Sequence, residues 1–420
     1  MGKSLTSTLR ALRHRNYRLF FYGQVVSLTG TWIQTIAMSW LVYRLTGSAF
    51  LLGLTGFASQ IPILLFSPFA GIWTDRVNRR RILLVTQTLA MLQAFTLALL
   101  VFSGHVAAWH VIALALLLGT IMALDAPARQ SFLVFMVDDR ADLPNAIALN
   151  SFMFNAARLV GPSIAGVLIA AFGESICFLL NGLSYAGVLA ALLAMNVQQP
   201  APKAAPEHWW LGMRRGFSYA FGFPPIRFML LLLALVSFMA TPYLTLMPIF
   251  AAEVFHGGAA TLGLLIGAAG FGAIGATIYL ASRASVAGLS NVIPVGAALA
   301  GIALILFTRS VWLWLSIPLM IAAGFGIIVQ LASINTVLQT IVDEDKRGRV
   351  MSLYTMAYLG VMPLGSLAAG RLAQSIGAPD TLLLGGVCCV LGAALFATRL
   401  SRIRELIRPI FLKRGIIPSS

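Results

Sequence analysis

A short charged turn separates two long apolar segments and has the sequence Gly71-Ile72-Trp73-Thr74-Asp75-Arg76-Val77-Asn78-Arg79-Arg80-Arg81. Gly71 permits two helices to approach closely, and Asp75 stands at the end of an apolar segment beside several guanidinium groups. Such a cluster of opposite charges forms or breaks when the surrounding helices move. The turn therefore indicates a membrane protein whose parts shift relative to one another.

Apolar segments of about 20 residues or more recur along the whole chain. The chain has 420 residues, of which 59% are apolar and 10% charged. Each segment is long enough to cross a hydrocarbon core of about 30 Å as a helix, and none alternates as barrel strands do. We therefore predict an all-α integral membrane protein with twelve spans: 16–43, 49–74, 80–103, 108–128, 144–171, 175–196, 225–252, 260–283, 288–308, 311–341, 349–375 and 378–398.

The net charge of +16 is explained best by membrane topology. If the N-terminus is cytoplasmic, all but four of the 29 Lys and Arg residues fall in cytoplasmic segments, the exceptions being Arg44, Arg158, Arg309 and Arg371. Because cytoplasmic loops are rich in these residues, we predict that both termini are cytoplasmic. A nucleic-acid partner is disfavoured, since the charge is divided among loops too short to fold alone.

Two six-helix halves are indicated by a polar break and by an internal repeat. Three glycines recur 204 residues later, pairing Gly161 with Gly365, Gly166 with Gly370 and Gly173 with Gly377. The predicted parts are an N-terminal bundle (1–196), a cytoplasmic linker (197–223), a C-terminal bundle (224–400) and a basic cytoplasmic tail (401–420). The tail mixes basic with apolar residues, so it either anchors the topology or lies on an anionic membrane surface.

Further motifs lie in the first and fourth spans: Asn16-Tyr17-Arg18-Leu19-Phe20, Gly30-Thr31-Trp32-Ile33-Gln34, the segment 40–48, and Asp125-Ala126-Pro127-Ala128-Arg129-Gln130. With the turn at 71–81 they resemble the major facilitator superfamily, in its bacterial branch of enterobactin-exporter-like, macrolide-efflux and transmembrane secretion effector proteins. The resemblance runs over nearly the full length. It departs from the family at Trp73 and at Asn78, where the family has a second glycine; asparagine tolerates the turn conformation that glycine would take.

The resemblance implies two pseudo-symmetric bundles and a secondary active exporter of amphipathic small molecules, of drug or siderophore type, that works by alternating access. It also implies a bacterial inner (plasma) membrane, a functional monomer, no cofactor or metal, and protons as the coupling ion. The alternatives are an importer or a lipid or lysolipid flippase of the same fold. An intramembrane enzyme is a remote alternative, because the chain has no zinc-protease motif.

Two motifs take their expected roles from the resemblance. Gly71, Asp75, Arg76 and Arg79 form a gating motif. Gly161, Pro162 and Gly166 in the fifth span form an exporter-like motif, whose small residues allow tight packing and whose proline bends the helix.

Charged residues inside or at the ends of spans are candidates for coupling, because a charge at that depth is costly. They are Asp125, Arg158 and Glu253, and Asp125 is the intramembrane acid nearest to Arg158 in sequence. Antiporters of the superfamily often carry an arginine in the middle of the fourth span, where this chain is apolar at 113–119. Proton coupling is therefore an expectation that the sequence leaves open.

The resemblance implies that the first, fourth, seventh and tenth spans line a central cavity, so polar and aromatic residues of these spans, together with Asn155 of the fifth span, are candidates for substrate contact. They are Gln24, Thr31, Trp32, Gln34, Asn155, Phe238, Tyr243, Gln330, Asn335 and Gln339. For each of them the alternative is a hydrogen bond between helices without substrate contact. Pro242 and Pro248 predict a bend in the seventh span.

Overall fold

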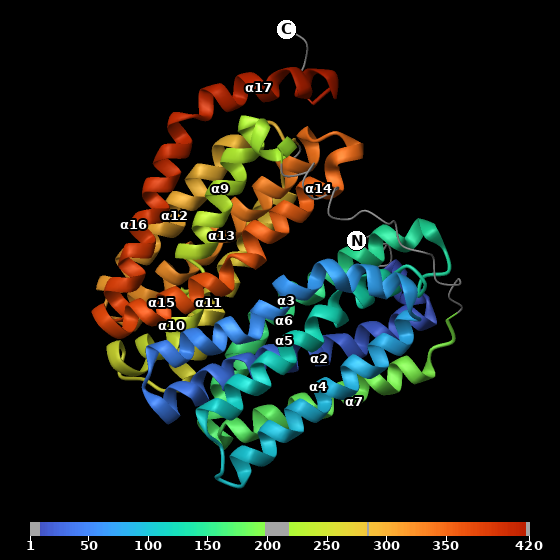
Figure 1. The fold of residues 1–420 in the computed structure, drawn as a ribbon, viewed down its shortest axis with the longest axis vertical. Coiled ribbons are helices and arrows are strands. Elements are labelled where there is room, and N and C mark those ends of the chain that lie inside the picture. The colour runs from blue at the N-terminus through green and yellow to red at the C-terminus, as the bar shows by residue number, and fades with distance from the viewer. Residues whose placement is uncertain (1–8, 198–217, 284, 417–420) are drawn as a thin grey trace, which may run out of the picture. The chain divides into compact units, whose positions relative to one another are not determined.

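The computed structural model describes residues 9–197, 218–283 and 285–416, and of 67–76 and 345 only the backbone. Across these ranges the chain forms α-helices with short 3₁₀ and π segments, and no strand. Figure 1 shows their arrangement within each half of the chain.

The helices of the first half of the chain are η1 (Arg10–Arg13), α2 (Arg15–Thr46), α3 (Ala49–Arg76), α4 (Arg79–Phe102), α5 (Ala108–Leu133), η2 (Arg140–Asp142), α6 (Leu143–Phe172) and α7 (Glu174–Ala194). Those of the second half are α9 (Pro224–Met239), α10 (Tyr243–Ile249), η3 (Phe250–Val254), α11 (Ala259–Ala281), α12 (Leu289–Arg309), α13 (Leu313–Ile341), α14 (Glu344–Thr355), η4 (Met356–Gly360), α15 (Met362–Ile376), α16 (Ala378–Thr398) and α17 (Leu400–Lys413). Twelve helical stretches among the described residues are long and apolar enough to cross a membrane. The predicted all-α fold with twelve spans is therefore confirmed.

The seventh span is interrupted where a bend is predicted. Helix α9 ends at Met239, Pro242 precedes the first residue of α10, and Pro248 lies just before a π segment, η3. Proline removes a backbone donor and π segments widen a helix, so both features relax the regular α-helical ladder here.

The chain divides into two compact units. The first comprises Met1–Gly47, Ala58–Ala205 and Gly257–Gly267, and the second comprises Ser48–Phe57, Pro206–His256 and Ala268–Ser420. In the first unit α2 packs on α6 and α7, and α4 on α5 and α7. In the second unit α12 packs between α13 and α16. Most of the predicted linker 197–223 lies outside the described residues, so the predicted boundaries of the two bundles stay predictions.

The repeated glycines occupy equivalent places in the two units. A Cβ added to Gly161 would lie 2.5 Å from the Cβ of Trp32, and one added to Gly365 would lie 2.4 Å from the backbone oxygen of Phe238. Both distances are shorter than any normal contact. Each glycine is therefore required because a helix crosses directly over it.

The second pair of glycines marks another close crossing in each unit. A Cβ on Gly166 would lie 3.1 Å from the Cα of Gly263, and one on Gly370 would lie 2.7 Å from the Cα of Gly53. In both crossings glycine faces glycine. The internal repeat predicted from the sequence is thus a repeat of packing geometry.

The third pair ends a helix in each unit. Gly173 follows α6 with φ of +82°, and Gly377 follows α15 with φ of +87°. Side chains disfavour positive φ, so glycine is the residue suited to both turns.

The C-terminal tail forms the amphipathic helix α17. Its apolar residues Ile403, Ile407 and Phe411 are buried, and α17 contacts α9, α12, α13 and α16. Arg402, which directly precedes Ile403, is exposed. The buried apolar residues of α17 are therefore covered by helices of the same unit.

Candidate functional site

Among the described side chains of the first unit, Asp125 on α5 is the most completely buried carboxylate. Its side chain is wholly buried, and its Oδ1 accepts hydrogen bonds of 2.8 Å from Thr86 Oγ1 and from Gln87 Nε2, both on α4. Within the described part of the chain Oδ2 has no hydrogen-bond partner, and it lies 3.7 Å from Arg129 Nη2. One oxygen is thus held by neutral donors and the other is left to a proton or to the arginine.

Arg129 lies one helical turn after Asp125 and is only 8% exposed. Its guanidinium carbon lies 4.9 Å from the centre of the Phe154 ring on α6. When Asp125 is ionised, the two charges balance. When Asp125 is protonated, the arginine still faces the electron-rich ring. Arg129 therefore faces both a carboxylate and an aromatic ring.

A second buried polar cluster connects three helices of the same unit. Gln34 Nε2 on α2 donates to Gln93 Oε1 on α4, and Asn181 Nδ2 on α7 donates to Gln34 Oε1, both at 2.8 Å. Ser184 Oγ donates to the Asn181 carbonyl oxygen at 2.7 Å. Gln34 is fully buried, so in this structure its amide joins helices and does not line an open cavity.

The other substrate candidates of the first unit lie in different environments. Gln24 is buried, and the Thr31 hydroxyl lies 3.2 Å from that of Tyr185. Asn155 is exposed, with its amide nitrogen bonded to the carbonyl oxygen one turn back. Trp32 is half-buried and lies under Arg158.

Arg158 does not supply the charge closest to Asp125. Its guanidinium carbon lies 5.9 Å from the Trp32 ring, whereas the ion pair of Asp125 is formed by Arg129. The structure thus pairs Asp125 with an arginine of its own helix, which the sequence analysis did not name as its partner. Pro162 lies inside α6, between the two close-packed glycines of the exporter-like motif.

The candidates of the second unit also separate into groups. Tyr243 is buried, Phe238 half-buried and Glu253 exposed. Gln330 is buried, and neither of its amide atoms has a hydrogen-bond partner among the described residues. Asn335 and Gln339 line a pocket near the end of α13 and are hydrogen-bonded to each other at 2.6 Å. These last two are the predicted cavity residues that the structure brings together at a pocket.

Of Gly71, Asp75 and Arg76 in the predicted gating motif the structure describes only the backbone. Arg79 donates from Nε to Ser131 Oγ at 3.1 Å, and its guanidinium carbon lies 5.3 Å from the Phe135 ring. The motif is thus anchored at its end to α5 and the segment after it.

Two neighbours of Arg79 have structural roles. Arg80 donates to the carbonyl oxygens of Leu192 and Leu193 at the end of α7, where a helix favours positive charge. Asn78 caps α4 by accepting from the Arg81 backbone at 3.3 Å, with φ of −61° and ψ of 115°. The expectation that Asn78 adopts the turn conformation of a glycine is therefore wrong, because its φ is negative and its side chain caps α4.

A charged cluster links the residues just before α2 to the segment just before α6. His14 Nδ1 lies 3.2 Å from Asp138 Oδ2, and His14 Nε2 lies 3.0 Å from Asp142 Oδ2; Arg10 also pairs with Asp142. Burial lowers the pKa of His14, but the hydrogen bonds and charges of Asp142 and Asp138 outweigh it. The pKa of His14 is therefore raised above its ordinary value.

Sequence reasoning missed the hydrogen-bond partners of Asp125, Gln34 and Thr31. Thr86, Gln87 and Gln93 lie in the third span, and Asn181 and Tyr185 in the sixth. A signal existed, because Thr86 and Gln93 are seven residues apart and so share one face of an otherwise apolar helix.

Comparison with known proteins supports one family. Residues 6–408 match the family model described as transmembrane secretion effector. The staphyloferrin A transporter of Staphylococcus aureus is 28% identical over 379 residues, covering 89% of this chain and 93% of the relative. The multidrug efflux pump Tap of Mycolicibacterium fortuitum is 27% identical over 416 residues, covering 92% and 96%.

A solved structure shares the fold. The inward-facing, occupied form of a bacterial homologue of the human lysosomal transporter Spinster superposes with a TM-score of 0.72 at 16% identity, covering 93% of this chain and 97% of that one. The family match spans nearly the whole chain and both relatives named are transport proteins. The chain is therefore a multi-pass membrane transporter of the major facilitator superfamily and belongs to its transmembrane secretion effector family.

Proposed function

We propose that the protein is a secondary active exporter of amphipathic small molecules that works by alternating access and is coupled to protons. The observation that carries the proposal is Asp125, a wholly buried carboxylate whose Oδ2 lacks a hydrogen bond and lies 3.7 Å from Arg129. Such a carboxyl takes up a proton on Oδ2 without breaking the hydrogen bonds to Oδ1. Asp125 is the proposed carrier of the coupling proton.

Export is supported by the family and by the relatives. The relatives named above are a siderophore transporter and a multidrug efflux pump, whose substrates are small molecules. We extend that substrate class to this chain, with a preference for neutral or anionic compounds because acidic residues are few. We also propose a bacterial plasma membrane location with both termini cytoplasmic, as the distribution of Lys and Arg favours.

We also propose that gating uses the charged turn at 71–81 and the glycine crossings. Asp75 and Arg76, with Arg79, would make and break charge contacts as the protein alternates. Gly166 against Gly263 provides a crossing without side chains between the two backbones, which lets helices slide over a short distance.

The test is substrate-triggered proton movement in proteoliposomes, with a panel of dyes, macrolides and siderophores. We expect proton release coupled to substrate movement in the wild type and its loss in Asp125→Asn. The matched control is Asp380→Asn, which removes the same charge from an exposed pair with Arg309. Transport that continues without a proton gradient, or that is equally impaired in both variants, would refute Asp125 as the proton carrier.

A further inference from the structure

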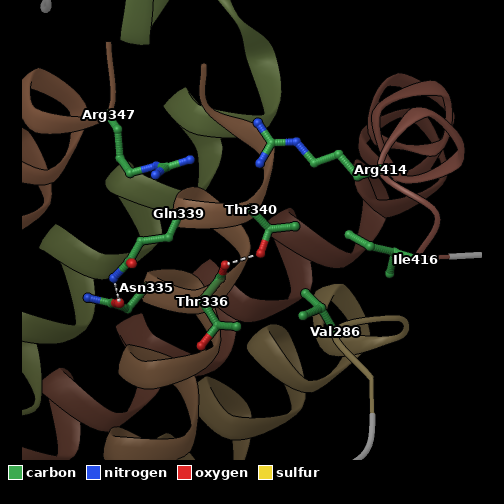
Figure 2. Close-up of a pocket in the computed structure, with 8 residues that line it drawn as sticks. All are labelled: Val286, Asn335, Thr336, Gln339, Thr340, Arg347, Arg414 and Ile416. Carbon is green, nitrogen blue, oxygen red and sulfur yellow. Dashed lines mark hydrogen bonds between the residues drawn. The ribbon is translucent and has the colours of Figure 1, made fainter. Parts of the chain in front are cut away.

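A pocket of about 500 Å³ lies in the second unit beside the end of α13. Figure 2 shows that the α13 side chains form its floor, while two arginines reach in from different elements. The polar residues that line it are Asn335, Thr336, Gln339, Thr340, Arg347 and Arg414. The pocket thus combines two cations with hydrogen-bonding groups, and it belongs to the second unit, whereas Asp125 belongs to the first.

The two arginines give the pocket a positive charge. Arg347 comes from α14 and Arg414 follows α17, and their guanidinium groups point into the same space from opposite sides (Figure 2). Arg414 is held by a 3.1 Å hydrogen bond from Nη2 to the Val342 carbonyl oxygen. None of the described residues that line the pocket is acidic. A ligand with negative charge is therefore favoured there.

Arg347 also has an unused donor. Its Nε is buried and has no hydrogen-bond partner in the part of the chain that the structure describes. Its Nη2 lies 3.9 Å from Glu344 Oε1, beyond hydrogen-bond distance, and the Arg347 and Glu344 side chains are 36% and 90% exposed. A buried guanidinium donor without an acceptor is costly, so this position calls for an acceptor from a ligand.

The floor of the pocket is suited to hydroxyl groups. Thr336 and Thr340 donate their hydroxyl protons to carbonyl oxygens one turn back, at 2.9 and 2.7 Å. Their oxygens therefore present lone pairs and can accept hydrogen bonds from a ligand. Gln339 and Asn335 add amide groups beside them.

We propose that this pocket binds a phosphate group carried on a small hydroxylated body. The phosphoglycerol head group of a lipid and free glycerol phosphate share this chemistry. A phosphate offers oxygens to two guanidinium groups at once, whereas one carboxylate fills one fork. The volume exceeds that of a bare ion and lies within the range of small-molecule pockets. Bound there, the ligand links α14 to the end of the chain after α17.

The test is binding to the purified full-length protein in detergent. The probes are glycerol 3-phosphate, inorganic phosphate, and micelles doped with phosphatidylglycerol, with phosphatidylcholine micelles as the neutral control. The readouts are a binding titration and the shift in thermal unfolding midpoint. The variants are Arg347→Gln and Arg414→Gln. The matched control is Arg402→Gln, which removes an exposed charge from α17 that does not line the pocket.

We expect saturable binding that weakens by about tenfold or more in both pocket variants, since each loses a charge-assisted hydrogen bond, and that persists in Arg402→Gln. Saturation by glycerol 3-phosphate identifies a soluble ligand, and saturation by phosphatidylglycerol alone identifies a lipid. Because Arg414→Gln also removes the bond to Val342 and can impair folding, Arg347→Gln decides the result in that case. The proposal would be overturned if neither glycerol 3-phosphate nor phosphatidylglycerol showed saturable binding. It would also be overturned if Arg402→Gln weakened binding as much as the two pocket variants.

Discussion

The Asp125–Arg129 pair predicts a large coupling energy between two side chains. At 3.7 Å, and with an effective dielectric constant of about 20, the two charges attract by about 4 kcal/mol. Asp125 is fully buried and Arg129 is 8% exposed, so removing either charge leaves the other without its partner in the interior. Loss of one partner of a buried pair typically costs about 3–5 kcal/mol.

We therefore expect Asp125→Asn and Arg129→Gln each to lower the free energy of unfolding by about 3 kcal/mol, since the ring of Phe154 and the donors on α4 retain part of each environment. The double variant has no unpaired buried charge. It should be destabilised by about 2–3 kcal/mol less than the sum of the two single variants.

The assay is equilibrium unfolding in mixed micelles, followed by tryptophan fluorescence of the four forms of the cycle. The exposed pair Arg309–Asp380 serves as a matched control, with its charged atoms only 3.1 Å apart and side chains 61% and 53% exposed. Its cycle should give a coupling of about 0.2–1 kcal/mol. The reasoning fails if the buried cycle is additive, or if the exposed pair couples as strongly as the buried one.

Three further results follow from single contacts. Gly166→Leu should destabilise the protein by about 1–3 kcal/mol in thermal unfolding, because its side chain would meet the backbone of Gly263, whereas Gly187→Leu, with nothing within 4 Å, should not. The pKa of His14 is raised in the folded state, so the stabilisation that its charged form gives the protein is complete below about pH 6.5 and is lost as the pH rises through the folded pKa. His14→Gln should therefore lower the midpoint of thermal unfolding more at pH 5.5 than at pH 8.5. Glu174→Gln removes a two-bond ion pair with the arginine at the end of α2, at 2.7 and 3.1 Å, so the midpoint should fall and its dependence on salt should weaken.

The fold was predictable because the bilayer imposes it on composition. A span must be long, apolar and helical, and these properties are visible in one sequence. The predicted span 378–398 coincides with α16, and the predicted 311–341 overlaps α13 to its last residue. Glycines were informative for a similar reason. A glycine that two backbones approach cannot be replaced without a clash, so Gly166 and Gly370 record contacts with distant helices.

The partner of Asp125 was missed because of an error at a helix end. The predicted fourth span stops at residue 128, which assigns Arg129 to a loop, whereas α5 continues to Leu133. Continuation places Arg129 one turn from Asp125 on the same face of a helix. Helix ends depend on caps and on packing with neighbours, which hydropathy does not report.

The function of a polar stripe could not be read from the sequence. Residues such as Gln34 mark a face that is turned away from lipid, but this face can meet either a cavity or another helix. Which of the two applies depends on Gln93 and Asn181, contributed by helices far along the chain. Asn335 and Gln339 have the same polar pattern and do line a pocket, together with Arg347 and Arg414.

The two units repeat their glycines but not their charges. The buried charged residues of the described chain are Asp125, Arg129, Asp142 and Glu174, and all belong to the first unit. Among the described residues, close glycine crossings therefore occur in both units, whereas buried charged side chains occur in the first unit. Two of the acids lie at helix ends: Asp142 accepts close contacts from Arg10 and His14, and Glu174 pairs with Arg44 through two bonds.

Asp125 differs from both of these acids. It lies inside a membrane span, with one oxygen unbonded and its arginine at 3.7 Å. A purely structural ion pair would gain by closing that distance, because burial of charge is repaid only by close, hydrogen-bonded geometry. The unbonded oxygen and the 3.7 Å distance distinguish Asp125 from the two acids at helix ends. This geometry is the basis on which we propose Asp125, in the first unit, as the proton carrier.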